Sequence, residues 1–416
     1  MSLSTVTLSA AVRQNLLSLQ GTADLLATTQ SRLATGKKVN SALDNPTNFF
    51  TAAGLDSRAS DISNLLDSIG NGVQVLQAAN TGITSLSKLV DTAKSIANQV
   101  LQQPSGYTSK ATFTSAVPTG AGPLAVAGTA TDLTVGGTNS LGGQAIKFDT
   151  AAGTTTITLG TAANQVNTIT GLNSALSAAG IQLTASVNTN GSLTFTSSND
   201  AASQVITNGA AYVAPPATAS SSVNIDTTSG AAFTAGTIVA AVADPVSQAT
   251  RSSLVTQYNQ IITQITTTAQ DASFNGINLL NGDSLKLVFD ETGKSATTIT
   301  GVTFNPNGLG LKSLTAGSDF IDNTATNTVL TALNTASVTL RSQASAFGAN
   351  LSIVQIRQDF NKSLINVLQT GSSALTLADS NEEAANSQAL STRQSIATSA
   401  LSLANQSQQS VLQLLR

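Results

Sequence analysis

Apolar side chains recur every three or four residues near both ends of the chain, a spacing that places them on one face of a helix. Near the start the repeating positions are Leu8, Val12, Asn15, Leu19, Ala23, Leu26, Gln30 and Leu33. Near the end they are Leu390, Ala397, Leu401, Ala404, Gln408, Val411 and Leu415. Each stripe has the spacing of a coiled-coil seam and includes polar residues, so each predicts a helix that buries its apolar face against partners.

Two further stripes predict long helices between these ends. One contains Leu65, Ile69, Leu76, Ile83, Leu86, Leu89, Ile96 and Val100. The other contains Leu340, Phe347, Leu351, Val354, Leu364 and Leu368. A helix over residues 56–102 would be roughly 70 Å long at about 1.5 Å per residue, which makes it a rod and not a compact globule.

The middle of the chain has a different composition. Six of the eight prolines lie from Pro104 to Pro245, and only seven charged residues lie from Ser105 to Asp244. Alternating patterns predict strands at 132–135, 144–149, 154–159, 181–187 and 192–197, and helical spacing predicts a helix at 164–179. A second hairpin pattern lies at 284–304, whereas 210–222 has the composition of a loop. We predict a β-rich α+β insert.

The composition excludes most familiar catalytic chemistry. The chain has no His, no Cys and no Trp, so it cannot form the common zinc sites, Ser–His or Cys–His nucleophile pairs, or disulfides. The acidic cluster Asp379, Glu382 and Glu383 fits a helix N-terminus, where negative charge is favoured. We expect no enzyme activity, no metal and no cofactor.

Charge and hydropathy limit the partners. A net charge of −3 gives no basic patch for nucleic acid or an anionic membrane. No run of about 18 apolar residues is present to cross a bilayer. Residues 1–17 lack the cationic region of a secretory signal peptide. We therefore expect neither nucleic acid nor a membrane as a partner.

Three motifs carry a resemblance to a known family. Residues 31–46, SRLATGKKVNSALDNP, resemble the signature that follows the first helix of bacterial flagellins. Residues 273–280, SFNGINLL, are similar to the family's Phe-Asn-Gly turn. Residues 404–416, ANQSQQSVLQLLR, are similar to the flagellin C-terminus. The resemblance covers residues 1–103 and 250–416, and residues 161–199 look like a weaker repeat inserted in flagellins and hook-associated proteins.

The resemblance implies a filament subunit that is exported unfolded by the flagellar type III apparatus and polymerises under a cap. It implies terminal inner-tube helices at 1–38 and 376–416, a helical rod at 39–103 and 246–375 with a small hairpin at 284–304, and an inserted outer domain at 104–245. The fold class is mainly α, a long coiled-coil-like helical hairpin from both chain ends with a β-rich insert.

The same resemblance implies an assembly interface on the terminal helices. Its residues are Leu8, Val12, Leu16, Leu19, Leu26, Leu33, Leu401, Leu403, Val411, Leu414, Leu415 and Arg416. The partners it implies are other flagellin subunits, an export chaperone, the filament cap and hook-associated proteins. The expected location is the extracellular flagellar filament.

The sequence departs from the family pattern in two ways. The insert lies between the first and second core helices, whereas in many flagellins it follows the hairpin. The second departure concerns the segment that the innate-immune flagellin receptor senses, here Val90, Thr92, Lys94 and Ile96, together with Gln257. Alignment with the family's Leu-Gln-Arg-Val-Arg-Glu-Leu-Ala puts Thr92 at the key arginine and Gln257 at the key glutamate, so we expect weak or no receptor binding.

Two alternatives remain open. A hook–filament junction protein shares the terminal seams, although the Leu-Leu-Arg end and the Phe-Asn-Gly turn favour a filament subunit. The insert could also act as a surface adhesin, which its scarcity of aromatic residues supports little. A metallopeptidase insert, as some flagellins carry, needs His-Glu-x-x-His and is excluded because the chain has no His.

Overall fold

The computed structural model describes residues 10–116, 133, 142–188, 191–226 and 236–414. The chain divides into two compact units, residues 1–73, 286–298 and 352–416, and residues 74–285 and 299–351, which we call unit 1 and unit 2. Long helices α2 (Pro46–Leu101) and α5 (Asn323–Thr376) each contribute one part to each unit. Across the described residues, no helix is long and apolar enough to cross a membrane.

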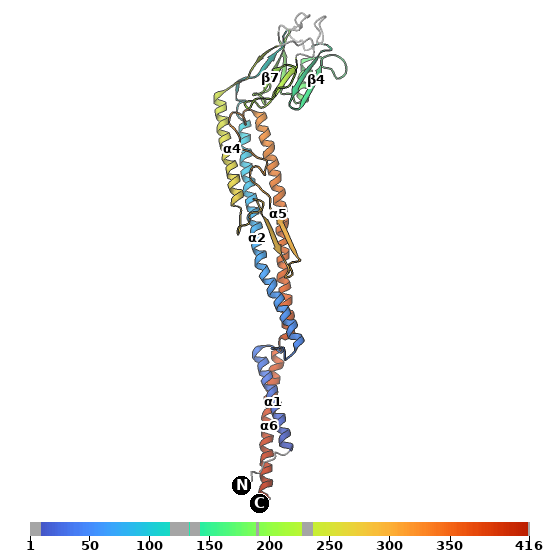
Figure 1. The fold of residues 1–416 in the computed structure, drawn as a ribbon, viewed down its shortest axis with the longest axis vertical. Coiled ribbons are helices and arrows are strands. Elements are labelled where there is room, and N and C mark those ends of the chain that lie inside the picture. The colour runs from blue at the N-terminus through green and yellow to red at the C-terminus, as the bar shows by residue number, and fades with distance from the viewer. Residues whose placement is uncertain (1–9, 117–132, 134–141, 189–190, 227–235, 415–416) are drawn as a thin grey trace. The chain divides into compact units, whose positions relative to one another are not determined.

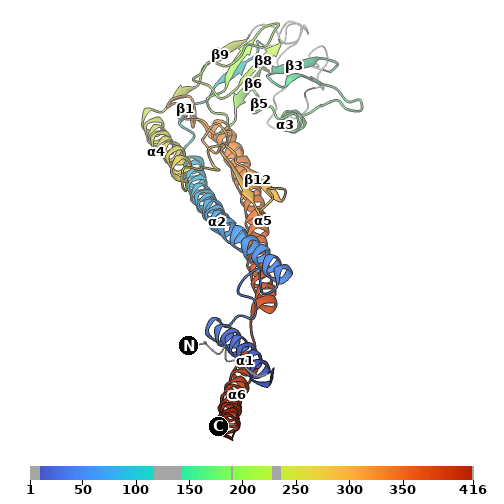
Figure 2. The same ribbon diagram turned by 60° about the horizontal axis from the view of Figure 1, so that its bottom comes forward.

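Unit 1 contains two helix pairs. Helix α1 (Ala10–Thr35) packs along α6 (Ser380–Leu414), as Figures 1 and 2 both show. In the second pair, Ala59 and Ile62 of α2 pack against Leu368 of α5. The predicted helices at both ends and in both rod segments are therefore confirmed. Helix α2 begins at Pro46, ten residues before the predicted start at residue 56.

The predicted hairpin forms from β11 (Ser284–Val288) and β12 (Ala296–Thr300). In unit 1, its Phe289 carbonyl accepts a 2.9 Å hydrogen bond from Asn361 Nδ2 of α5, and the Arg357 guanidinium lies 5.8 Å from the Phe289 ring. Glu291 pairs with Arg58 of α2 at 2.6 Å. These contacts with α2 and α5 hold the hairpin against the α2–α5 pair of unit 1.

Unit 2 contains three helical segments that lie side by side, the 74–101 part of α2, α4 (Pro245–Asp271) and the 323–351 part of α5 (Figures 1 and 2). The buried stripe of α2 repeats at intervals of three and four: Leu76, Ala79, Ile83, Leu86, Val90, Ala93, Ala97 and Val100. From α5, Leu333, Leu340 and Phe347 are buried. The α2 stripe of unit 2 is therefore part of a complete core, because the neighbouring helical segments cover it.

The Phe-Asn-Gly segment is a tight turn that ends α4. Phe274 and Ile277 exchange two 3.0 Å backbone hydrogen bonds, and Asn275 and Gly276 between them have φ of 50° and 79°. Positive φ at both central positions is the reason for the Asn-Gly pair. The buried amide of Asn278 then donates to the carbonyls of Ala269 (2.8 Å) and Gln270 (2.9 Å), which satisfies the C-terminus of α4.

Between α2 and α4 the chain forms a β-rich head, which matches the predicted fold class and order of elements. One sheet has the order β5-β6-β2-β9 and the other β4-β3-β8-β7, and β1 pairs with β10. The strands are β1 (Tyr107–Ser109), β2 (Thr112–Thr114), β3 (Ala145–Thr150), β4 (Gly153–Thr158), β5 (Leu183–Val187), β6 (Leu193–Ser197), β7 (Val205–Asn208), β8 (Ser222–Asp226), β9 (Thr237–Val239) and β10 (Val242–Ala243). Phe113, Phe148 and Phe195 are fully buried at the centre of the head core.

Two local predictions for the head need correction. Helix α3 is Ile169–Ala178, not 164–179, because Thr168 is extended and its hydroxyl caps the helix by accepting a 3.0 Å bond from the Gly171 N–H. Val166 instead forms a parallel bridge with Leu159. The sequence missed β1, β2 and β7 to β10. Of the predicted strand at 132–135, only Leu133 is described, in a bend, and the rest lies outside the described residues.

A buried polar junction joins the head to α5 within unit 2. The fully buried Asp322 carboxylate accepts hydrogen bonds from the Ser203 hydroxyl (2.6 Å), the Ser220 hydroxyl (2.5 Å) and, at the start of α5, the Ala325 N–H (3.0 Å). The Asp322 charge, together with burial as the larger cause, raises the pKa of Tyr107 to about 12. Asp322 therefore links two head loops to a helix N-terminus.

Arg251 of α4 completes the same junction. Its guanidinium is buried and donates to the carbonyls of Pro104 (Nη2, 2.8 Å) and Phe320 (Nη1, 3.0 Å) and to Asn323 Oδ1 (3.3 Å). Burial lowers the pKa of Arg251, and the nearby Asp322 charge opposes that shift. Arg251 of α4 thus ties the start of the inserted segment, at Pro104, to the start of α5 at Asn323.

Asp322→Ala should weaken this junction. The change removes a charged acceptor from three buried or half-buried donors, so we expect the free energy of unfolding to fall by about 3 kcal/mol. Urea unfolding of the monomer, followed by tyrosine fluorescence, measures it. Asp359→Ala is the matched control, since the Asp359 side chain is 77% exposed and its only charged partner among the described residues is Lys362, whose Nζ lies 3.7 Å away. Equal midpoints for the two variants would contradict the role given to Asp322.

Candidate filament interface

The α1–α6 pair meets along two heptad stripes in unit 1. On α1 the buried or half-buried positions whose side chains are described are Val12, Asn15, Leu19, Thr22, Ala23, Leu26, Thr29 and Arg32. On α6 they are Glu383, Ser387, Leu390, Gln394, Ala397, Leu401 and Ala404. Of the predicted α1 seam, Ala23 is half-buried, whereas Gln30 and Leu33 are exposed, and Thr29 takes the buried place expected for Gln30. The Thr22 hydroxyl is satisfied by the Ser18 carbonyl at 2.8 Å.

This seam is incompletely buried. Among the described side chains, Val12 is the only apolar residue of α1 that is buried, and no apolar residue of α6 is buried. Leu19, Leu26 and Leu401 are half-buried. Two helices cover each other on one face only. Full burial of a large apolar side chain contributes about 1.5–3 kcal/mol, and the side chains that stay open in the pair do not gain this stabilisation.

Large apolar side chains also lie outside the seam. On α1 Leu16, Leu17, Leu25 and Leu33 are exposed, and on α6 Ile396 and Leu403 are exposed. Leu17, at 70% exposure, and Leu403, at 68%, are the most open of the six. Leu17, Leu25 and Ile396 were not predicted because they do not follow the seam spacing. Their only sequence signal is an apolar residue on a flank of a weakly polar helix.

The structure describes the predicted interface residues to different extents. Val12 is buried in the seam, Leu19, Leu26 and Leu401 are half-buried, and Leu16, Leu33 and Leu403 are exposed. Val411 and Leu414 lie within α6, where only the backbone is described. Leu8, Leu415 and Arg416 lie outside the described residues.

The connections between the two helix pairs of unit 1 form an elbow, residues 36–45 and 377–379. Lys38 N–H donates to the Thr376 carbonyl (2.7 Å), and Ala378 N–H donates to the Gly36 carbonyl (3.0 Å). Gly36 ends α1 with φ of 68°, a conformation that glycine adopts without strain. The two connections therefore brace each other through backbone bonds.

Asp44 fixes the longer connection. Its carboxylate accepts bonds from the N–H groups of Ser41 (2.8 Å) and Asn40 (2.9 Å) and from the Ser41 hydroxyl (3.1 Å). The Ser41 N–H, and next the Asn40 N–H, favour the ionised form and lower the pKa of Asp44. Asn45 then accepts from the Asn48 N–H (3.1 Å) and Pro46 starts α2. These contacts give a structural role to Asn40, Ser41, Asp44, Asn45 and Pro46 of the 31–46 motif.

The acidic cluster serves the start of α6. Asp379 Oδ1 accepts from the Asn381 N–H at 2.9 Å, which caps the helix. Glu383 is buried beside α1, and its Oε1 lies 3.4 Å from Arg32 Nη1. The pair fixes the end of the seam next to the elbow. In the part of the chain that is described, no group of three or more metal-ligating side chains of this kind comes together.

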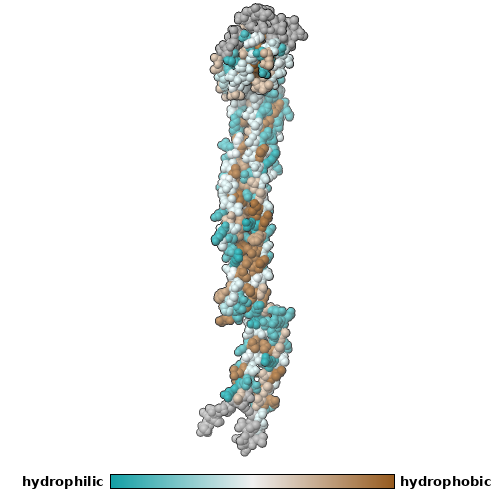
Figure 3. Space-filling view, turned by 90° about the vertical axis from the view of Figure 1, so that its right-hand side faces the viewer, coloured by the Kyte–Doolittle hydropathy of each residue, from teal (hydrophilic) through white to brown (hydrophobic). Residues whose placement is uncertain are grey.

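A second apolar surface lies on the unit 1 part of α5. Ile353, Ile356, Phe360 and Val367 are exposed and lie at intervals of three, four and seven, so they share one helical face, the α5 stripe. The neighbouring face, with Val354 and Leu368, is buried. Figure 3 shows brown hydrophobic patches open to solvent on the side of the molecule that it presents.

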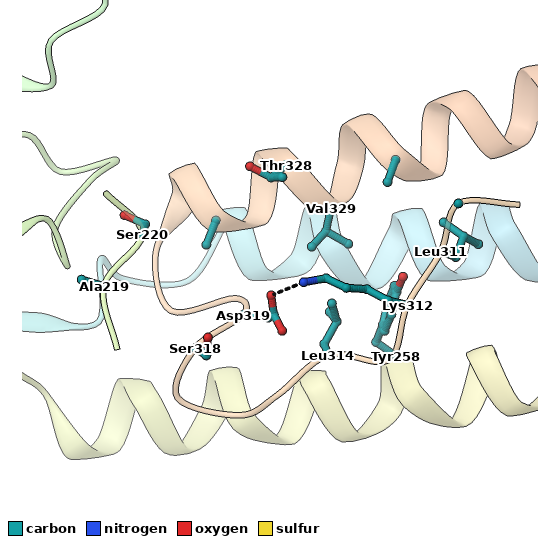
Figure 4. Close-up of a pocket in the computed structure, with 13 residues that line it drawn as sticks. Ala219, Ser220, Tyr258, Leu311, Lys312, Leu314, Ser318, Asp319, Thr328 and Val329 are labelled. Carbon is teal, nitrogen blue, oxygen red and sulfur yellow. Dashed lines mark ion pairs between the residues drawn. The ribbon is translucent and has the colours of Figure 1, made fainter. Parts of the chain in front are cut away.

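A pocket of about 300 Å³ in unit 2 lies between α4, the N-terminal part of α5 and the 310–319 loop (Figure 4). Lys312 Nζ and Asp319 Oδ1 are 3.5 Å apart across it. Burial, and secondarily the Asp319 charge, raise the pKa of Tyr258 to about 12. Lys312 and Asp319 both belong to the 310–319 loop, so their ion pair joins two positions of that loop.

The residues of the predicted receptor segment divide between core and surface. Val90 and Ile96 of α2 are buried, and Lys94 is half-buried. Thr92 of α2 and Gln257 of α4 are exposed. Both are neutral side chains, so this surface of unit 2 has no charge at either position.

Comparisons with known proteins identify the class of both ends. Residues 4–119 match the family model of the bacterial flagellin N-terminal helical region, and residues 330–415 match that of the bacterial flagellin C-terminal helical region. Both ends of the chain are therefore similar to the helical end regions of bacterial flagellins.

Similar curated proteins are flagellins as well. Flagellin FljM of Caulobacter vibrioides is 34% identical over 166 residues, 40% of this chain and 60% of the relative. Flagellin FljO of the same organism is 31% identical over 41% of this chain and 62% of the relative. A flagellin of Brucella melitensis is 28% identical over 40% of this chain and 62% of the relative. The chain thus spans about 60% of the length of these relatives.

Proposed function

We propose that this protein polymerises into a bacterial flagellar filament for swimming, and that its terminal helices complete their folding only against neighbouring copies. The observation that carries the proposal is the burial pattern of the α1–α6 pair. Its described side chains include a single buried apolar residue, Val12, whereas the α2 stripe in unit 2 is almost fully buried. A helix without a core of its own gains stability from partners.

The open surfaces fit self-association. The flanks of α1 and α6 expose Leu17, Leu25 and Leu403, and the α5 stripe exposes another apolar face. A protein that joins different faces of itself in a contact that does not close forms an open helical polymer. Residues 1–38 and 376–416 would line the inner tube, and the predicted interface residues on them would be covered by neighbouring copies.

The remaining parts of the chain would take the roles that the family suggests. Residues 39–103 and 246–375, with the hairpin at 284–304, would form the rod that surrounds the inner tube. Residues 104–245 would form an outer domain at the filament surface. The relatives quoted above are flagellins, which supports a filament subunit over a hook–filament junction protein or an adhesin.

The partners follow from the same proposal. The chain would leave the cell unfolded through the flagellar export apparatus, with a chaperone covering its terminal helices. It would then assemble beneath a cap, beyond hook-associated proteins, in the extracellular filament. Nucleic acid and membrane have no role in it.

Leu403→Gln should block polymerisation and leave the monomer intact. Leu403 is 68% exposed in the single chain, so its replacement costs the monomer little, whereas a filament that covers it loses roughly 1.5–3 kcal/mol per subunit. Electron microscopy of protein incubated with filament seeds measures the length and number of filaments.

The matched control for that experiment is Val213→Gln, because Val213 is an exposed apolar residue of the head, 56% open. We expect Val213→Gln protein to form filaments as the parent does, and deletion of residues 1–38 or 376–416 to abolish them. Normal filaments from Leu403→Gln and from both deletions would refute the proposal.

We also propose that the protein activates the innate-immune flagellin receptor weakly. The support is the neutral, exposed Thr92 and Gln257 at positions where the family resemblance expects an arginine and a glutamate. An interface that lacks both charges loses charge-assisted hydrogen bonds to its partner.

A reporter-cell assay with monomer measures receptor activation. We expect potency at least tenfold below that of an enteric flagellin, and a rise in potency for the double variant Thr92→Arg, Gln257→Glu. Thr256→Arg, on the same helix as Gln257 and also exposed, is the control that adds charge at a neighbouring position. Wild-type potency equal to that of the enteric flagellin would overturn this proposal.

A further inference from the structure

Strand β9 (Thr237–Val239) forms one edge of the four-stranded sheet β5-β6-β2-β9 in the head. It pairs antiparallel with β2 on one side, where Ile238 lies opposite Phe113. Its other side pairs with no strand among the described residues. All three of its residues are exposed, and Figure 2 shows β9 on the side of the head away from α3. The outer N–H and C=O groups of β9 are therefore open to a further strand.

The sheet edges at β5 and β4 are closed by groups from nearby segments. At β5, the opposite edge of the same sheet, the Asn173 amide of α3 donates to the Ala185 carbonyl (3.1 Å) and accepts from the Ala185 N–H (2.7 Å). This side chain takes the place of a neighbouring strand. In the second sheet, the Thr158 carbonyl on edge strand β4 accepts from the Val166 N–H (2.9 Å). Among the described residues, β9 has no cover of this kind.

The open edge has the composition of a strand that pairs readily. Residues 237–243 read TIVAAVA and include no charge, no proline and no glycine. Ile238 and Val239 are 39% and 51% exposed, and Val242 of β10 is 54% exposed. Short uncharged segments rich in β-branched residues add readily to other strands, and natural proteins blunt such edges with lysine, proline or a bulge. Strand β9 has none of these three features.

We propose that β9 pairs edge to edge with β9 of a second copy of this chain, so that the heads of two copies join through an antiparallel β-ladder. The sequence has no charged residue between Asp226 and Asp244, so two such edges meet without like-charge repulsion. A charged partner segment would find no counter-charge in β9 or in the residues that flank it in sequence. An antiparallel pair of identical strands is self-complementary, because each copy presents the same edge across a two-fold axis.

The pairing should be weak between free monomers. A strand of three residues offers far less contact than the roughly 800 Å² per partner that a stable complex buries. Polymerisation would hold many heads close together and raise their effective concentration, which favours a contact that is weak in solution. In its strength the inference therefore rests on the proposed function, whereas the pairing surface contains no residue of α1 or α6.

Single cysteines test the pairing, because the chain has no cysteine of its own and any disulfide must join two copies. Thr237→Cys or Ile238→Cys places a thiol on the open edge, where directly opposed Cβ atoms of an antiparallel pair come close enough for a disulfide. Thr184→Cys is the matched control, since Thr184 is exposed on β5, the edge that Asn173 closes.

The full chain, concentrated and incubated with filament seeds, is oxidised mildly and analysed by non-reducing electrophoresis. We expect at least about ten times more dimer from an edge cysteine than from Thr184→Cys, because a disulfide forms only between side chains held at short distance. Thermal melting of the soluble protein shows that each variant folds.

A lysine at the edge should disrupt the pairing. In the edge-cysteine background, Val239→Lys brings two like charges together and should lower the dimer yield at least about fivefold, whereas Thr184→Lys should not. Dimer yields equal to that of the Thr184→Cys control, or yields that Val239→Lys leaves unchanged, would overturn the inference.

Electron microscopy of the same samples separates this inference from the proposed function. Filaments whose edge cysteines give no more dimer than the control reject head pairing alone. Dimers in samples without filaments support head pairing and contradict polymerisation. Samples with neither filaments nor dimers at high protein concentration reject both.

Discussion

The constraint on which this molecule depends is that two helices can bury only one face of each other. In unit 2, α4, the 323–351 part of α5 and their loops cover the α2 stripe, and residues such as Leu86 and Val90 are fully buried. In the α1–α6 pair the same heptad spacing yields half-buried Leu19 and Leu401, because within the described residues each of these two helices has only the other beside it. The same heptad spacing thus produces a fully buried core in unit 2 and an incompletely buried face in the α1–α6 pair.

The head is stabilised in a different way. Its attachment within unit 2 depends on buried polar groups, with Asp322 accepting from two head serines and Arg251 donating to the carbonyls of Pro104 and Phe320. Directional bonds of this kind fix an orientation, whereas apolar contacts between helices tolerate sliding. A chain that inserts a domain between two helices of one core needs such a fixed junction, so that the insert does not disturb the helical packing.

The helices could be predicted from the sequence because their signal is local and repeats many times. The burial of Thr22 and Thr29 was not predicted, because a threonine can be buried at low cost when its hydroxyl bonds within its own helix, as that of Thr22 does to the Ser18 carbonyl. Strands β7 and β8 were missed because they are four and five residues long, too short for a repeating pattern to stand out from the neighbouring loop. The contacts of Asp322 could not be foreseen, because its partners Ser203 and Ser220 lie more than 100 residues away in the sequence.

Amide hydrogen exchange in residues 10–35 and 380–414, compared between monomer and filament, tests the central claim most directly. If the terminal helices complete their folding on assembly, their amides will exchange rapidly in the monomer and at least about a hundredfold more slowly in the filament. The α2 amides from residue 76 to residue 100 should be protected in both states, because their core is complete in the single chain. Strong and equal protection of α1 and α6 in monomer and filament would contradict the account.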